Sequence, residues 1–284
     1  MPVTKLKYCL LFFILLESYN CEAQYNEVGF LLGASNYKGE LSRHLFNDKF
    51  IHPAVGIFYR HNFDRRSSWK IELMYGKISG NDAKAITPFE LDRNLSFYSS
   101  ILEVSPQFEF NFLPFETGRN DYSFTPYLFT GIAFFKFNPK AAIGNSSYEL
   151  QPLGTEGQGT NGIKPYKRFQ VAIPIGGGIK IAVGDIGIGI EVGARRTYTD
   201  YLDDVSTLYP EMNSLLAAKG PAAVALSDRS FSRLDTSASV PIAFGKQRGN
   251  ASDNDWYLFA GVTVFWRLSS VLKDICKPFK FRRY

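Results

Sequence analysis

Few side chains in this 284-residue sequence have the types and the spacing that enzymatic chemistry requires. Residues 157–162, GQGTNG, match the pattern GxGxxG, but a dinucleotide site needs that pattern between a strand and a helix. Here it lies within a polar loop. His44, His52 and His61 have no Cys or carboxylate at ligand spacing, so we expect solvated or interfacial histidines. The sequence also has no GxSxG motif and no phosphate-binding P-loop, and nucleotide binding is not predicted.

Asp200, Asp203 and Asp204 are close enough in sequence to suggest a calcium loop. The stretch lacks the alternating oxygen ligands of such a loop, and Asp side chains also fix turns by bonding to nearby backbone N–H groups. We therefore expect a structural turn here and no metal. An outer-membrane hydrolase would need Ser, His and a carboxylate that converge at one rim, and no such set is evident. The sequence predicts a non-enzymatic protein without cofactors.

The first 23 residues have the organisation of an export signal. Two lysines precede an apolar run over residues 8–16, and small side chains follow at the positions that a signal peptidase reads. We expect cleavage after Ala23. A lipid-modified Cys21 is the less favoured alternative, because bulky residues precede it. Cleavage leaves Cys276 as the single cysteine of the mature chain, so no disulfide can form within it.

Along most of the mature chain, apolar residues alternate with polar, small or charged ones, as in strands whose two faces meet different surroundings. The clearest segment is residues 186–198, where Ile and Val alternate with Gly, Glu and Arg. Past residue 23, no stretch has 18 uninterrupted apolar residues, so a helical membrane crossing is not expected. The pattern predicts eight strands, at residues 27–35, 55–60, 69–76, 101–112, 127–137, 169–182, 186–198 and 256–268.

The connections between these strands alternate in length. Short turns follow the second, fourth and sixth strands, and long polar loops follow the first, third, fifth and seventh. The turns are residues 63–67, 114–122 and 183–185, and the loops are residues 37–52, 80–95, 138–165 and 199–255. This predicts an all-β fold, an eight-stranded antiparallel transmembrane β-barrel with short periplasmic turns and long extracellular loops. A secreted lipocalin-like or sandwich protein is the alternative. That fold does not explain why short turns lie at one end of the strands and long loops at the other.

The faces predicted to point into the barrel carry as many bases as acids. Enclosed charges can form ion pairs, whereas an unpaired charge there would be costly. Eight strands enclose an interior just wide enough for side chains to fill, so an open channel is not expected. The predicted interior charges are Arg60, Lys70, Lys180 and Arg195 together with Glu72, Glu103, Glu109 and Glu191.

Residues 269–284 form a basic tail with five Lys or Arg residues and one Asp. Such a tail suits a docking site for a periplasmic partner, with Cys276 available for an intermolecular disulfide. A tail held near anionic headgroups is the alternative. The predicted docking residues are Cys276, Lys277, Phe279, Lys280, Phe281, Arg282 and Arg283. The predicted domains are a signal peptide at 1–23, an outer-membrane barrel at 24–268 and this periplasmic tail.

Three further segments carry a family pattern: residues 27–41, which include GASNYKGEL, residues 150–159, LQPLGTEGQG, and residues 191–206, which include RTYTDYLDDVS. Together they resemble the PorG family of outer-membrane barrels associated with the type IX secretion system. The resemblance implies an outer-membrane protein that contacts a periplasmic ring of the PorK lipoprotein and PorN and helps anchor that ring. It assigns no catalytic residues.

Two functions from different classes follow from these observations. The first is a barrel in the outer membrane of a Gram-negative cell that docks a secretion machine through its periplasmic turns and tail. The second is a surface-binding, adhesion or structural barrel that acts through its long extracellular loops. A pI of 8.9 would suggest nucleic-acid binding, but most of the excess positive charge lies in the tail. Neither nucleic acid nor a small-molecule substrate is expected as a partner; lipids of the outer membrane are.

Overall fold

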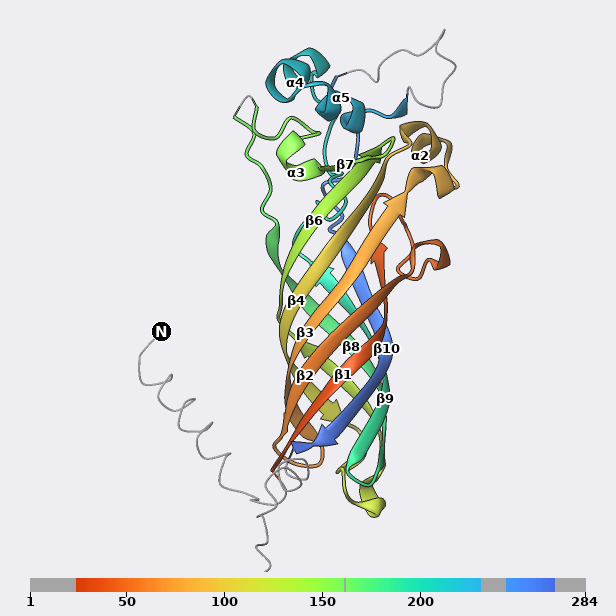
Figure 1. Cartoon of the computed structure of the whole chain (residues 1–284), viewed down its shortest axis with the longest axis vertical. Coiled ribbons are helices and arrows are strands. Elements are labelled where there is room, and N and C mark those ends of the chain that lie inside the picture. Colours follow the sequence, from red (N-terminus) through yellow and green to blue (C-terminus); the bar gives the residue numbers. More distant parts are fainter. Residues whose placement is uncertain (1–23, 161, 231–243, 269–284) are drawn as a thin grey trace, which may run out of the picture.

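The structure, a computed structural model, describes residues 24–160, 162–230 and 244–268. Its described part is a tall cylinder of antiparallel strands with short helices gathered at one end (Figure 1). The strands are β1 (Tyr25–Lys38), β2 (His52–Asn62), β3 (Ser67–Asn81), β4 (Ser96–Asn111), β5 (Phe124–Gly131), β6 (Ala133–Ile143), β7 (Ser146–Glu149), β8 (Phe169–Val183), β9 (Ile186–Thr197) and β10 (Trp256–Arg267). The helices are η2 (Asp48–Phe50), η3 (Asp82–Lys84), α2 (Pro88–Arg93), η4 (Asn120–Tyr122), α3 (Leu150–Leu153), α4 (Met212–Lys219) and α5 (Pro221–Ser227).

Strand pairing closes the sheet into a ring. β1 pairs with β2 on one side and with β10 on the other, the latter from Glu27↔Arg267 to Lys38↔Trp256. β2 pairs with β3 and β3 with β4, and both β5 and β6 then bridge β4 to β8. β8 pairs with β9 and β9 with β10, which completes the ring. Because β5 and β6 share one position, the ring has eight strand positions, and the predicted all-β antiparallel class and eight-strand order are confirmed.

The fifth predicted strand, residues 127–137, is interrupted at Ile132. The register is unbroken across the gap, since Gln107↔Gly131 and Val104↔Phe134 belong to the same ladder. Continuing the registers on both sides sets Pro106 of β4 opposite Ile132, and Pro174 of β8 opposite Gly131. Proline has no N–H to donate to a ladder. The two prolines, which lie next to this gap on the neighbouring strands, therefore remove two N–H donors from the ladders. The register of the strand is the same on both sides of the gap.

The long loops contain more regular structure than the sequence predicts. β7 is a short strand that folds back on β6 as a hairpin beyond the ring. The β9–β10 loop contains two helices, because Gly220, with a φ of +83°, ends α4 and Pro221 begins α5. All the helices except η4 lie at the end of the cylinder that carries the long loops (Figure 1).

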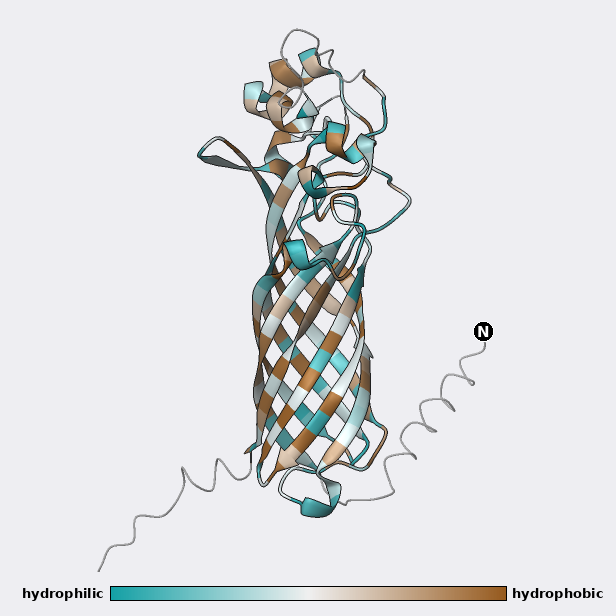
Figure 2. Cartoon of the chain, turned by 90° about the vertical axis from the view of Figure 1, so that its right-hand side faces the viewer, coloured by the Kyte–Doolittle hydropathy of each residue, from teal (hydrophilic) through white to brown (hydrophobic). Residues whose placement is uncertain are grey.

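The wall of the cylinder has an apolar outer face and a charged inner face. Figure 2 shows apolar and polar residues alternating along the strands. On β9, for example, Ile186, Ile188 and Ile190 are 44–53% exposed, whereas Glu191 is buried at 2%. The same alternation holds on β2, β3, β4 and β8. The predicted inside and outside faces of these five strands are the ones observed.

Basic residues mark one boundary of the apolar outer face. Lys77 on β3, Lys136 on β6 and Arg196 on β9 are exposed on the outside of the wall, toward the long-loop end. At the short-turn end the outer face carries aromatic side chains, among them Trp69 and Phe110. An apolar band between these two levels has the arrangement of a barrel wall in contact with lipid.

None of the helices within the described ranges has the length and the hydropathy that a membrane crossing needs. The predicted signal peptide, residues 1–23, and the predicted docking tail, residues 269–284, lie outside the described residues.

Candidate functional site

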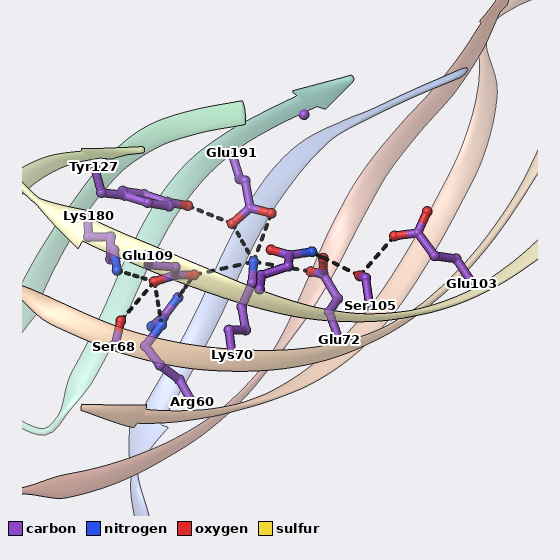
Figure 3. A network of polar contacts seen from close by, with 12 residues as sticks. Arg60, Ser68, Lys70, Glu72, Glu103, Ser105, Glu109, Tyr127, Lys180 and Glu191 are labelled. Carbon is purple, nitrogen blue, oxygen red and sulfur yellow. Dashed lines mark hydrogen bonds and ion pairs between the residues drawn. The ribbon is translucent and has the colours of Figure 1, made fainter. Parts of the chain in front are cut away.

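Two groups of buried charged side chains stand out in the structure, and the first fills the barrel. All eight predicted interior charges lie inside the ring, each at most 2% exposed. Glu109 is at the centre, with oxygens 2.8 Å from Arg60 Nε, 2.7 Å from Lys180 Nζ and 3.4 Å from Lys70 Nζ (Figure 3). Strands that are far apart in sequence are thereby joined across the barrel axis.

The same network continues toward the long loops. Lys70 Nζ lies 2.9 Å from Glu191 and 3.6 Å from Glu72. Arg195 Nε lies 3.1 Å from Glu103, and its NH2 nitrogen lies 3.7 Å from Glu72. Tyr127 donates its hydroxyl hydrogen to Glu191 at 2.7 Å, and Tyr257 donates to Glu103 at 2.8 Å. Each of the eight charges thus has an oppositely charged partner, and we call this set the barrel network.

Glu27 is a ninth member that the sequence reading missed. It is 1% exposed and lies 2.9 Å from Arg60, and it accepts a hydrogen bond from the Thr117 hydroxyl at 3.0 Å. The sequence analysis predicted a strand at residues 27–35 without assigning either of its faces to the interior. Tyr25, Glu27 and Leu31 lie at alternate positions of the strand and are all buried. This alternation could have predicted that Glu27 faces the interior.

The short-turn end of the barrel is closed. Between β4 and β5, the chain turns inward so that Phe115 is 1% exposed and packs against Phe265. Gly118 N–H donates to the carbonyl of Gly184 in the β8–β9 turn at 2.7 Å, which ties the two turns together. With the barrel network above this closure, the interior is filled by side chains, as expected for eight strands.

The second group lies at the long-loop end and was not predicted as a site. The three segments that carry the family resemblance meet there. Tyr37 donates its hydroxyl hydrogen to Asp203 Oδ2 at 2.5 Å, and Thr155 donates to Asp204. Glu156 accepts hydrogen bonds from the backbone N–H groups of Ser206 and Thr207 at 2.8 and 3.0 Å. Residues 27–41, 150–159 and 191–206 therefore form one folded unit.

Arg248, from the chain just before β10, is the buried cation of this unit. It is 2% exposed, and its NH1 nitrogen donates to Glu156 Oε1 at 2.9 Å and to the carbonyl of Asp204 at 2.5 Å. Arg93 of α2 forms a second tie, with paired hydrogen bonds to Asp82 at 2.8 and 2.9 Å. Arg93 NH1 also donates to the carbonyl of Arg248 at 2.6 Å, which joins the β3–β4 loop to the β9–β10 loop.

Four carboxylates in the same unit have no such partner. They are Glu40, Asp200, Asp203 and Asp255, which we call the rim carboxylates. One oxygen from each of Glu40, Asp203 and Asp255 lies within 4.8 Å of the other two. Among the described residues, no Lys, Arg or His nitrogen lies within 4.0 Å of any rim carboxylate. Asp203 and Asp255 are buried at 1% and 0%.

Burial and mutual repulsion raise the pKa of each rim carboxylate. Burial raises the pKa of Glu40 to about 10, with further increases from the charges of Asp203 and Asp200. Burial likewise raises the pKa of Asp200 to about 8 and that of Asp203 to about 7. The pKa of Asp255 is also raised well above its ordinary value, first by burial and then by its acidic neighbours. Neighbouring Asp204 has a pKa of about 6, raised by burial and lowered by Arg248.

The glycine pattern and the three histidines that the sequence offered as possible sites do not come together in the structure. Gly157 and Gly159 adopt positive φ angles in a tight turn that follows α3, so the GxGxxG pattern is not at a strand–helix junction. His44 is exposed, His52 Nε2 contacts Ser79 Oγ at 2.7 Å, and His61 Nδ1 contacts Asn26 Oδ1 at 2.7 Å. The expected turn at Asp203 is present, because its Oδ1 accepts the N–H of Val205 at 2.9 Å.

The sequence pattern of a family described as a domain of unknown function, DUF6089, matches residues 6–218 of the chain. No curated protein has a matching sequence.

Three solved structures are similar in fold. Neisserial surface protein A is 7% identical with a TM-score of 0.41, and the match covers 87% of this chain and 99% of that one. The attachment invasion locus protein Ail of Yersinia pestis, in complex with the heparin analogue sucrose octasulfate, is 10% identical with a TM-score of 0.39, covering 86% and 98%. The N-terminal β-barrel domain of Pseudomonas aeruginosa OprF is 10% identical with a TM-score of 0.33, covering 86% and 100%.

Proposed function

We propose that this chain, which belongs to the DUF6089 family, is a non-enzymatic barrel of the bacterial outer membrane. The observation that carries the proposal is the contrast between the two faces of the wall. The outer face exposes a band of Ile, Leu, Val and Phe side chains, while the inner face is filled with ion pairs. A closed ring leaves no strand edge unpaired, which lipid requires. A protein dissolved in water would gain nothing from this inside-out arrangement.

We further propose that the barrel docks a periplasmic partner at its short-turn end. Both ends of the ring, Tyr25 of β1 and Arg267 of β10, lie at this end, so the described chain ends at this end, just before the proposed docking tail. Exposed Arg66 and Arg119 lie on the turns. The resemblance to the PorG family gives the partner its identity, a ring of PorK and PorN in the type IX secretion system. The filled interior argues for an anchor and against a conduit.

The test is removal of residues 269–284 from the full chain, followed by affinity purification from detergent-solubilised outer membranes. We expect the shortened barrel to insert and to shift its gel mobility on boiling, but to lose PorK- and PorN-like proteins. A Cys276→Ser variant, analysed on reducing and non-reducing gels, shows whether a disulfide contributes. Recovery of the same partners with the shortened chain would exclude docking through the tail.

Surface binding through the long loops is the second candidate function. Apolar side chains are exposed at the tips of the β1–β2 and β3–β4 loops, with Phe46 at 67%, Ile86 at 89% and Phe89 at 51%. A Phe46→Ser, Ile86→Ser double variant is the matched test, because it leaves the tail intact. If this variant reduces cell adhesion while secretion and partner recovery persist, the loops carry the function.

A further inference from the structure

The rim carboxylates have the spacing of ligands around one metal ion. Calcium binds carboxylate oxygens at about 2.3–2.6 Å, so two ligand atoms on opposite sides of the ion lie roughly 4.6–5.2 Å apart. Oxygens of Glu40, Asp203 and Asp255 all lie within 4.8 Å of one another. A single calcium ion can therefore touch all three. Magnesium, with ligands at about 2.0–2.1 Å, would need a tighter group.

Buried oxygens without partners provide a second, independent observation. Asp200 is 6% exposed, and neither of its carboxyl oxygens has a donor at hydrogen-bonding distance and angle, although the Ser206 side chain is close enough to lower its pKa. The carboxyl group lies near the other three, since its negative charge raises the pKa of both Glu40 and Asp255. Glu40 Oε2 is also buried without a partner. A buried polar atom left without a partner is costly, and here the unpartnered atoms are carboxyl oxygens.

We propose that the rim carboxylates bind a calcium ion, with Glu40, Asp203 and Asp255 as ligands and Asp200 as a fourth carboxylate beside them. The ligand set consists of oxygen alone, which is what calcium prefers. The proposal does not depend on the docking partner, because it rests on side chains at the opposite end of the barrel.

Backbone contacts hold the proposed ligands in place. Asp203 Oδ1 accepts the N–H of Val205 at 2.9 Å, and Asp255 Oδ2 accepts the N–H of Leu202 at 2.9 Å. The other oxygen of each carboxylate, Asp203 Oδ2 or Asp255 Oδ1, contacts the hydroxyl of Tyr37. Tyr37 lies beside them, with its hydroxyl 2.5 Å from Asp203 Oδ2 and 3.2 Å from Asp255 Oδ1.

A cleft reaches one member of the cluster. Gly39 packs directly against Asp255 Oδ1 and the Tyr37 hydroxyl, and a larger residue there would collide with both. Glu40 is the rim carboxylate that lines a cleft of about 390 Å³, which it shares with Gly39, Arg93 and Arg248. An ion bound there would join the start of the β1–β2 loop to both ends of the β9–β10 loop. Calcium would then hold the long-loop end together.

Isothermal titration calorimetry of the full, detergent-solubilised chain with calcium chloride alone tests the proposal, after removal of metal with EDTA. We expect one site with a dissociation constant of about 10⁻⁴–10⁻³ M, the range of extracellular calcium modules. Magnesium chloride should bind at least ten-fold more weakly. Glu40→Gln and Asp255→Asn should each weaken calcium binding by at least ten-fold.

Asp48→Asn is the matched control, because Asp48 is an exposed carboxylate in the same loop as Glu40, and its calcium binding should equal that of the unaltered chain. The boiling-dependent shift in gel mobility identifies any variant that does not fold. Terbium luminescence sensitised by Tyr37, with displacement by calcium, gives a second readout on the unaltered chain. The proposal is overturned if the unaltered chain takes up no calcium, in which case protons alone neutralise the cluster. It is equally overturned if Glu40→Gln and Asp255→Asn both fold and bind calcium like the control.

Discussion

The barrel network and the rim carboxylates both bury several acidic side chains, but they neutralise the charge in different ways. In the barrel, five glutamates lie among four bases, and Glu109 alone contacts three cations. At the rim, four carboxylates lie together with no base within ion-pair distance among the described residues. Each charge in the barrel thus has an oppositely charged partner within the chain. The rim needs protons or a bound cation from outside it.

This difference separates a structural role from a responsive one. A buried ion pair contributes little beyond a well-packed apolar core, but breaking it is strongly destabilising because the remaining charge has no partner. The barrel network therefore fixes the fold under all conditions in which its charges persist. The rim changes its charge with pH or with calcium, and the loops that it joins should change stability accordingly.

The largest effect is expected from Glu109→Gln. The change removes the charge that lies 2.7–3.4 Å from Lys180, Arg60 and Lys70 and leaves Lys180 without a carboxylate at ion-pair distance among the described residues. We expect the free energy of unfolding to fall by about 3–5 kcal/mol. Urea unfolding in detergent, followed by tryptophan fluorescence, measures it.

Glu149→Gln is the matched control for that change. Glu149 also contacts two cations, Arg168 at 2.9 Å and Lys140 at 3.4 Å, but its side chain is 40% exposed on the β6–β7 hairpin. Exposed pairs contribute at most about 1 kcal/mol. If the two substitutions have equal effects, burial does not distinguish the barrel network from surface pairs, and the comparison with the rim fails.

A smaller effect is expected from pH, and it should be confined to the rim. The pKa values of Asp203 and Asp200 are raised to about 7 and about 8, so the folded state holds protons that the unfolded state has lost. Stability conferred by such groups is therefore full at pH 4 and falls as pH rises to about 8. The charged and titratable groups that face these two are Glu40, Tyr37, Asp253, Asp255, Glu156, Arg93 and Arg248.

In EDTA, we expect hydrogen exchange of residues 198–206 to quicken between pH 5.5 and 8.5, after correction for the intrinsic rate. Asp203 alone should account for a loss of about 2 kcal/mol of local stability, since its pKa of about 7 is about 1.5 units above pH 5.5 and each unit corresponds to about 1.4 kcal/mol. Amides of β8 and β9 within the barrel should not change over the same range. Uniform quickening throughout the barrel would contradict a rim that titrates separately.

The barrel network was predictable from the sequence because strand alternation is local. Once a strand is recognised, its period of two assigns every side chain to one face, and Lys70, Glu72 and Glu109 follow directly. β1 was the exception, since Phe30 and Tyr37 fall on opposite faces and hide the alternation that contains Glu27. The partners within the network, such as Lys70 with Glu191, depend on the closure of the ring and were not predictable.

The rim was not predictable for a different reason. Glu40 and Asp255 are more than 200 residues apart, and neither belongs to a periodic segment. The stretch around Asp203, taken alone, indicates a turn. That turn is present, because Asp203 Oδ1 accepts the N–H of Val205. Glu40 comes from the β1–β2 loop, and Asp255 comes from the far end of the loop that contains Asp203. Only the closed ring, which brings the start of one loop beside the end of another, makes the cluster.

The smallest predicted effect distinguishes the barrel network from the rim carboxylates most directly, because this substitution is expected to raise stability and not to lower it. Asp200→Asn removes a buried charge whose charged neighbours, Asp203, Glu156 and Asp253, all repel it, and the amide oxygen that remains can still accept from Ser206. At pH 8.5 in EDTA, we expect local stability to rise by about 1 kcal/mol, near the gain from relieving one unit of pKa shift. Hydrogen exchange of residues 198–206 measures it, with Asp48→Asn as the control.

Removing a barrel carboxylate destabilises the protein because bases surround it, whereas removing Asp200 stabilises the loops because its charged neighbours are acids. With calcium in excess the gain should vanish, since the ion then neutralises Asp200 in the unaltered chain. A loss of stability in EDTA would mean that Asp200 has a favourable partner, and the rim would then resemble the barrel.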